Sequence, residues 1–145
     1  MLKNRRKDED MMRKELYDAV KSKITADVPE VKHVDLWNHN VEFIEQEESW
    51  DRPAVFVEFG SIEWSPYVGG GHRGSGVVRL HIVTDWIDGG QDEAWSLGKK
   101  LYAALEGLSG ESFGGMILSE TATNHNHEDI LESIDTYSVK YLLTQ

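Results

Sequence analysis

The densest group of side chains that could bind a metal is the run Asn124-His125-Asn126-His127-Glu128-Asp129. In an extended segment His125 and His127 would point to the same side, and a carboxylate could complete a site for zinc or another divalent ion. Two histidines supply only half of such a site, and these residue types are also ordinary in turns. We favour a turn between two strands. The alternative is a small metal-dependent hydrolase that uses His125, His127 and Glu128.

The other candidates for catalytic chemistry are isolated. His81 alternates with apolar residues in a strand pattern, so we interpret it as a sheet histidine with satisfied hydrogen bonds rather than a catalytic base. Ser75 lacks the G-x-S-x-G context of an activated nucleophile, and the chain has no cysteine. The glycine-rich run 69–74 lacks the Gly-Lys-Ser/Thr that opens a helix in phosphate-binding loops. The sequence therefore predicts no enzyme, no cofactor and no native metal site.

Tryptophan is frequent for a chain of this size, with five copies. We expect Trp86 and Trp95 in the core, where a strand end meets a helix. Trp50 and Trp64 lie in or beside polar loops, and exposed aromatic residues are enriched at protein interfaces. We therefore expect contacts with a partner or a second copy from six residues in or next to loops: Trp50, Arg52, Trp64, Tyr67, His72 and Arg73.

The apolar spacing predicts the elements that would hold these residues. A helix is expected from Met11 to Thr25, because apolar residues recur there at helical spacing, and Pro29 follows its end. His33 to Trp37 reads as a strand, with Val41 to Ile44 as its hairpin partner. Pro53 to Ile62 is apolar on both faces, which indicates a central strand covered by helices.

The most informative segment is Gly76 to Leu108, where the apolar period changes from two to 3.6. This change predicts a long strand, a glycine-containing turn and a helix laid on the sheet. Before it, residues 65–76 hold five glycines and read as a long flexible hairpin tip. Strands at Met116 to Thr123 and Ile134 to Leu143 complete the pattern. We predict an α+β fold: a mainly antiparallel sheet with an N-terminal helix and a central helix packed on it, and a long glycine-rich hairpin.

Composition limits the class of protein. The 145 residues suit a single domain, which we place at residues 11–145 behind a flexible basic tail at residues 1–10. The net charge of -11 disfavours nucleic-acid binding, because phosphates would be repelled. The absence of cysteine fits a reducing compartment, and no apolar run is long enough for a membrane helix or a secretion signal.

With its elements in order, the chain resembles the tail-terminator (tail-completion) family of long-tailed bacteriophages and prophages over nearly its whole length. The resemblance is carried by a glycine-rich hairpin and five segments: ELYDAVKSKI, RPAVFVEFGSIEW, VVRLHIVTDW, AWSLGKKLYAALEGL and TNHNHEDILESIDTYSVKYLL. Small neck proteins that close the capsid connector have a similar layout. The basic N-terminus and the turn rich in histidine and asparagine are not features of the family.

The resemblance implies a structural virion assembly protein without catalysis. Such proteins form a homo-oligomeric ring, usually a hexamer, that caps the tail tube and connects it to the head. The implied partners are further copies of the chain, the tail-tube protein and a head-completion protein. The implied location is the tail or neck of a virion made in the bacterial cytoplasm. A third hypothesis is a small adaptor domain that presents residues 61–76 to another protein without forming a ring.

Overall fold

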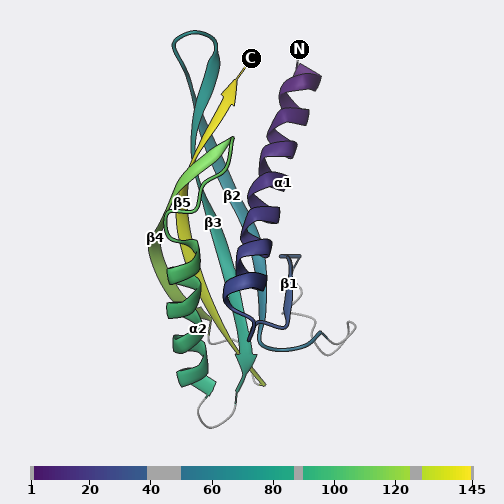
Figure 1. The fold of residues 1–145 in the computed structure, drawn as a ribbon, viewed down its shortest axis with the longest axis vertical. Helices are drawn as coiled ribbons and strands as arrows, with labels where there is room; N and C mark the ends of the chain where they lie inside the picture. The colour runs from purple at the N-terminus through teal and green to yellow at the C-terminus, as the bar shows by residue number, and fades with distance from the viewer. Residues whose placement is uncertain (1, 39–49, 87–89, 125–128, 145) are drawn as a thin grey trace.

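In the part of the chain that the structure describes, five strands form one sheet, and two helices pack on the same face of it (Figure 1). The computed structural model describes residues 2–38, 50–86, 90–124 and 129–144. Along the chain the elements are α1 (Leu2–Asp27), β1 (His33–Leu36), β2 (Ala54–Pro66), β3 (Gly71–Asp85), α2 (Gly90–Leu105), β4 (Phe113–Asn124) and β5 (Ile130–Thr144). The predicted α+β class is confirmed.

The strand order across the sheet is β1-β2-β3-β5-β4. Among the described strands, β1 and β2 pair in parallel, and the other three pairs are antiparallel. Two of the antiparallel pairs, β2–β3 and β4–β5, consist of strands that are consecutive in the chain, whereas α2 and β4 lie between β3 and β5. The predicted strand at residues 33–37 is confirmed in β1, but it pairs with the start of β2. Its proposed hairpin partner, Val41 to Ile44, lies outside the described residues.

The main core lies between the helices and the sheet face beneath them. The spacing of four residues in α1 and the alternation in the strands turn their apolar side chains to this layer, where burial stabilises each by about 1.5–3 kcal/mol. Its members include Met12, Leu16, Val20 and Ile24 of α1, Leu97, Leu101 and Leu105 of α2, and Val55, Val57, Val78, Leu80 and Ile82 of the central strands. None of the helices in the described ranges has the length and apolar character needed to cross a bilayer.

Carboxylates also fix the helices to the loop and strand beside them. Glu15 of α1 accepts hydrogen bonds from the Glu111 amide at 2.6 Å and the Ser112 hydroxyl at 2.7 Å. Glu106, just beyond α2, accepts one from the Leu118 amide of β4 at 3.0 Å. These bonds link both helices to the chain around β4, the edge strand whose pairing with β5 is irregular near Leu118.

Several elements are longer than predicted. The first helix begins at Leu2 rather than Met11, so residues 2–10 are helical where we expected a flexible tail. Leucine, lysine, arginine and glutamate, which favour helices, supply six of its nine residues, and neither glycine nor proline interrupts it. Strand β2 runs to Pro66 and β3 begins at Gly71, so the expected flexible tip at residues 65–76 is reduced to a turn at residues 67–70.

The prediction that Trp86 and Trp95 lie in the core is wrong. Trp86 is 55% exposed and Trp95 is 66% exposed. Trp86 follows the last residue of β3, and the described residues leave more than half of it uncovered. In α2 the buried side is defined by Ala94, Leu97 and Leu101. Trp95 directly follows Ala94, so its side chain is turned about 100° away from that side.

Candidate interaction surfaces

The β2–β3 hairpin extends to the end of the molecule that also holds both termini (Figure 1). We call its outer part, residues 62–76, the hairpin arm. β3 pairs with β2 on one side of the arm and with residues 139–144 of β5 on the other. The arm is therefore a three-stranded extension of the sheet, and its backbone is held by ladder hydrogen bonds rather than free to move as a loop.

The turn of the hairpin arm presents apolar and cationic side chains to solvent. Val68 is 95% exposed, and Tyr67 is exposed beside it. The Arg73 guanidinium lies over the Tyr67 ring, 4.2 Å from its centroid, which is a cation–π geometry. His72 is half-buried next to Arg73. Tyr67, His72 and Arg73, three of the residues predicted to make partner contacts, thus lie near the same turn.

Trp64 belongs to the same arm but faces the helices. Its ring packs over Gly74 on β3, where an added Cβ would lie only 2.7 Å from a ring carbon. The ring centroid is 6.3 Å from that of Tyr141 on β5. One of the five glycines therefore makes room for a tryptophan, a role that differs from the flexibility we had inferred from their number.

Trp50 and Arg52 lie at the other end of β2, roughly 40 Å from the turn at about 3.3 Å per residue. Both contact their own chain. The Trp50 ring meets Phe56 edge-on at 4.9 Å between centroids, and Arg52 forms an ion pair with Asp85 while lying over the Trp50 ring. The six predicted contact residues thus form two groups rather than one surface.

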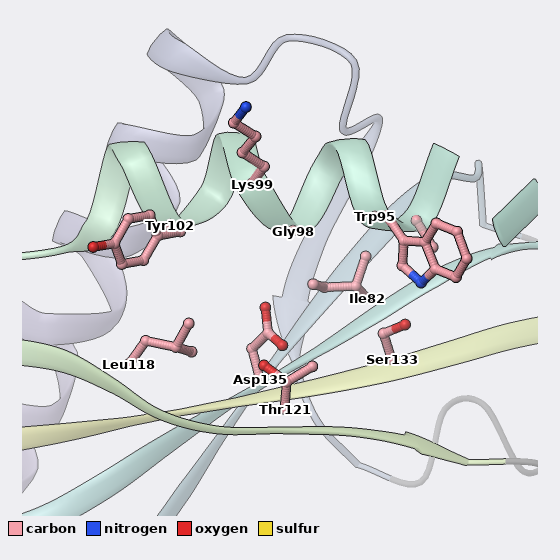
Figure 2. Close-up of a pocket in the computed structure, with 10 residues that line it drawn as sticks. Ile82, Trp95, Gly98, Lys99, Tyr102, Leu118, Thr121, Ser133 and Asp135 are labelled. Carbon is pink, nitrogen blue, oxygen red and sulfur yellow. The ribbon is translucent and has the colours of Figure 1, made fainter. Parts of the chain in front are cut away.

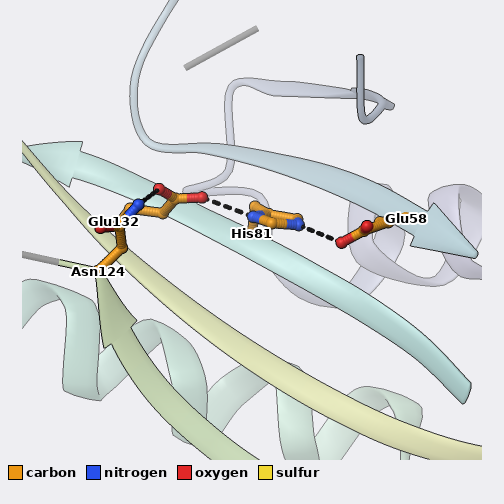
Figure 3. A network of polar contacts seen from close by, with 4 residues as sticks. All are labelled: Glu58, His81, Asn124 and Glu132. Atoms are coloured by element: carbon orange, nitrogen blue, oxygen red, sulfur yellow. Dashed lines mark hydrogen bonds and ion pairs between the residues drawn. The ribbon is translucent and has the colours of Figure 1, made fainter. Parts of the chain in front are cut away.

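A polar network crosses the sheet on the face opposite the helices (Figure 3). His81 of β3 is 4% exposed and lies between two carboxylates. Its Nδ1 is 2.5 Å from Glu132 Oε2, and its Nε2 is 2.8 Å from Glu58 Oε1. Asn124 Nδ2 donates to Glu132 Oε1 at 2.8 Å. The Trp37 ring stacks on the imidazole at 3.8 Å with an interplanar angle of 2°.

This arrangement makes His81 a structural residue. Both ring nitrogens face carboxylate oxygens, and Trp37 covers one face of the ring, so the imidazole has no nitrogen left for a substrate proton. The network joins β2, β3, β5 and β4 through their side chains. The interpretation of His81 as a satisfied sheet histidine is confirmed.

A cavity of about 360 Å³ lies between α2 and the β4–β5 side of the sheet (Figure 2). Trp95 and Tyr102 of α2 and Leu118 of β4 contribute to its walls, and Asp135 of β5 lies at its centre. Burial raises the pKa of the Asp135 carboxyl, and a hydrogen bond from Thr121 partly offsets that rise. The cavity thus combines aromatic walls with one poorly solvated carboxylate.

The cavity was not predicted from the sequence, although β5 carries a signal for it. Tyr137, Val139, Tyr141 and Leu143 alternate along β5, and all four are buried. Asp135 is the preceding position in the same alternation, and a carboxylate at a core-facing position is unusual unless it has a partner. The presence of Asp135 at a core-facing position is therefore the feature of the sequence that indicates the cavity.

The candidate metal ligands are not tested. His125, His127 and Glu128 lie outside the described residues. Within the described ranges, no group of three or more His, Asp or Glu side chains has an arrangement that could hold a metal ion.

The comparisons with known proteins concern the fold. No protein-family model and no curated protein matches this chain. A chain in the solved virion of a native gene transfer agent (GTA) particle is similar in fold, with a TM-score of 0.55 and 16% sequence identity. The match covers 88% of this chain and 94% of that chain. The likeness therefore extends over nearly the full length of both.

Proposed function

We propose that this protein is a structural component of a phage-like virion, acting as a tail terminator or a closely related neck protein. The observation that carries the proposal is the fold shared, over nearly the whole of both chains, with a component of a gene transfer agent virion. The family resemblance of the sequence points to the same class. In this role the chain forms a ring of copies and contacts a tail-tube protein and a head-completion protein.

The distribution of contact residues supports a ring. Tyr67, His72 and Arg73 lie near the turn of the hairpin arm, with Trp64 behind them, and Trp50 and Arg52 lie at the opposite end of β2. A cyclic ring of more than two copies uses a heterologous interface, in which two different surfaces of the chain meet. Two separated groups fit that requirement better than one central patch.

The charge of the chain supports a position around DNA. A net charge of -11 disfavours binding to phosphates, so DNA could pass a ring of this protein without being retained. The ring must then be held by local contacts strong enough to overcome repulsion between its own subunits.

Light scattering across a range of protein concentrations tests the proposal, with and without tail-tube protein. We expect a defined oligomer or a complex with the tube protein. Arg73→Ser should weaken assembly about tenfold, because it removes the cation stacked on Tyr67. Lys21→Ser is the matched control, since Lys21 lies 5.9 Å from the centroid of the Tyr17 ring on α1, outside the proposed contacts.

A chain that stays monomeric at all concentrations and never binds tube subunits would rule the proposal out. If shortening of the hairpin arm abolishes binding to another protein but leaves self-association intact, the adaptor hypothesis is supported instead.

A further inference from the structure

The cavity beside α2 holds one buried carboxylate, that of Asp135. Asp135 is only 5% exposed, and Thr121 is its hydrogen-bonding neighbour. Among the described residues no lysine, arginine or histidine forms an ion pair with it. Lys99 is part of the cavity lining, but its side chain extends away from the carboxylate, beyond α2 (Figure 2). Buried carboxylates are usually paired with a cation, and Asp135 has no such partner among the described residues.

The helix leaves the space above Asp135 open. Trp95 and Tyr102 are seven residues apart, two turns of helix, and lie on either side of Gly98 (Figure 2). An added Cβ at Gly98 would lie 3.7 Å from Asp135 Oδ2, so a longer side chain there would enter the cavity. Trp95 is 66% exposed and Tyr102 is 44% exposed. Two aromatic rings therefore border an opening that leads to a carboxylate.

This chemistry suits one class of group. A lysine or arginine side chain could pair its charge with the carboxylate while its stem and cationic head contact the aromatic rings. A neutral apolar group would leave the carboxylate buried and unpaired, and an anion would be repelled. The raised pKa of the Asp135 carboxyl is consistent with a site completed by a cation, since perturbed carboxyls in cavities mark functional positions.

We propose that the Asp135 cavity receives a lysine or arginine side chain from a neighbouring protein subunit in the assembly. The identification of the donor as an assembly partner rests on the proposed function, whereas the cationic nature of the group rests on the cavity alone. The charge of the whole chain, -11, favours approach of a basic surface to this site.

Binding of N-acetyl-L-arginine amide, followed by NMR at the Trp95 indole, tests the chemistry directly. We expect saturable binding with a Kd on the order of 1 mM, as a single charged side chain allows. Asp135→Asn, which keeps the shape of the side chain, should weaken binding about tenfold. Gly98→Leu should block it by filling the cavity, and Asp51→Asn, at an exposed position, should leave it unchanged. Unfolding curves establish that each variant is folded.

The neutral analogue N-acetyl-L-citrulline amide is the matched ligand control. Equal binding of the citrulline and arginine compounds, equal binding by Asp135→Asn and the parent protein, or no binding of the arginine compound would each overturn the proposal.

Light scattering then separates this proposal from the proposed function. If the parent protein forms an oligomer or binds the tube protein and Asp135→Asn does so equally well, the cavity does not hold a partner side chain, and the proposed function stands. If the parent protein neither self-associates nor binds the tube protein, the proposed function fails, and the arginine titration still decides whether the cavity binds a cation.

Discussion

At the scale of single residues, His81 joins two carboxylates that would otherwise repel each other across the sheet. Glu132 is 1% exposed, so its charge needs the imidazole at 2.5 Å. We expect His81→Ala to lower the free energy of unfolding by about 3 kcal/mol, because it removes a partner of a buried charge and the ring on which Trp37 stacks. Urea unfolding measures this loss.

His72→Ala is the matched control for that variant, since His72 lies in the same strand and is half-buried; a change below about 0.5 kcal/mol is expected. Replacing His81 and Glu132 together by leucine should recover part of the stability, because the buried carboxylate that lost its His81 contact is then removed as well. A loss of less than about 1 kcal/mol in His81→Ala would contradict a structural role for the network.

The raised pKa of the Asp135 carboxyl predicts that the stability of the protein depends on pH. The Asp135 pKa is raised in the folded protein, so the folded state holds the proton more tightly than the unfolded state. Ionised Asp135 therefore costs stability above its folded pKa, and this cost disappears as the pH falls through that value towards the ordinary carboxyl pKa. Asp135→Asn should accordingly be more stable than the parent protein at neutral pH, by roughly 1 kcal/mol, with a smaller difference in acid.

Urea unfolding of both proteins at neutral and acidic pH measures the difference. The exposed Asp51→Asn exchange should show only a small difference from the parent across the range. A stability gain in Asp135→Asn that grows on acidification would have the wrong sign and would exclude a destabilising carboxylate at this position.

At the scale of elements, two glycines should respond oppositely to the same substitution. Gly98 lies inside α2, where an added methyl would make only an ordinary contact at 3.7 Å, so Gly98→Ala should stabilise the protein by about 0.5–1 kcal/mol. Gly74 lies under Trp64, and the added Cβ would be 2.7 Å from its ring. Gly74→Ala should therefore destabilise by about 1–3 kcal/mol.

Thermal unfolding of the two alanine variants compares a helix glycine with a strand glycine in one protein. A stabilised Gly74→Ala would mean that Trp64 does not pack on β3, and that the hairpin arm is looser than its hydrogen-bonded register indicates.

The elements that could be predicted from sequence are those whose period is set by one buried face. The change of period between residues 76 and 108 identified β3 and α2, and the alternation from Tyr137 to Leu143 identified most of β5. The length of the hairpin arm could not be predicted in this way, since Gly74, which was interpreted as part of a flexible tip, makes room for Trp64 on the adjacent strand. Contacts between neighbouring strands are not visible in the period of either one.

The functional surfaces were harder to predict for a similar reason. Trp95 was expected in the core, where a strand end meets the helix, although its phase on α2 turns it out of the core. Trp50 and Arg52 were grouped with the hairpin residues because all six lie in or next to predicted loops, but the sheet separates them by the length of β2. Their position in the sequence suggested candidates for contacts, whereas their grouping in space depended on the strand order.

At the scale of the whole molecule, the net charge of -11 opposes any contact between copies. Raising the salt concentration from about 0.01 M to about 0.1 M shortens the Debye length from about 30 Å to about 10 Å, which screens this long-range repulsion. Contacts through Tyr67 and the apolar Val68, and a buried ion pair at Asp135, would be screened much less. We therefore expect self-association to strengthen about tenfold over this range, measured by sedimentation.

Whether salt strengthens or weakens self-association distinguishes a ring stabilised by apolar and buried contacts from one stabilised by exposed ion pairs. If higher salt instead dissociates the oligomer, exposed ion pairs between subunits dominate, and the basic stretch at the start of α1 becomes the first place to look for them. Arg73→Ser provides the internal comparison: it should weaken assembly without reversing the salt dependence, because the charge of the whole subunit, and not that one side chain, sets the repulsion.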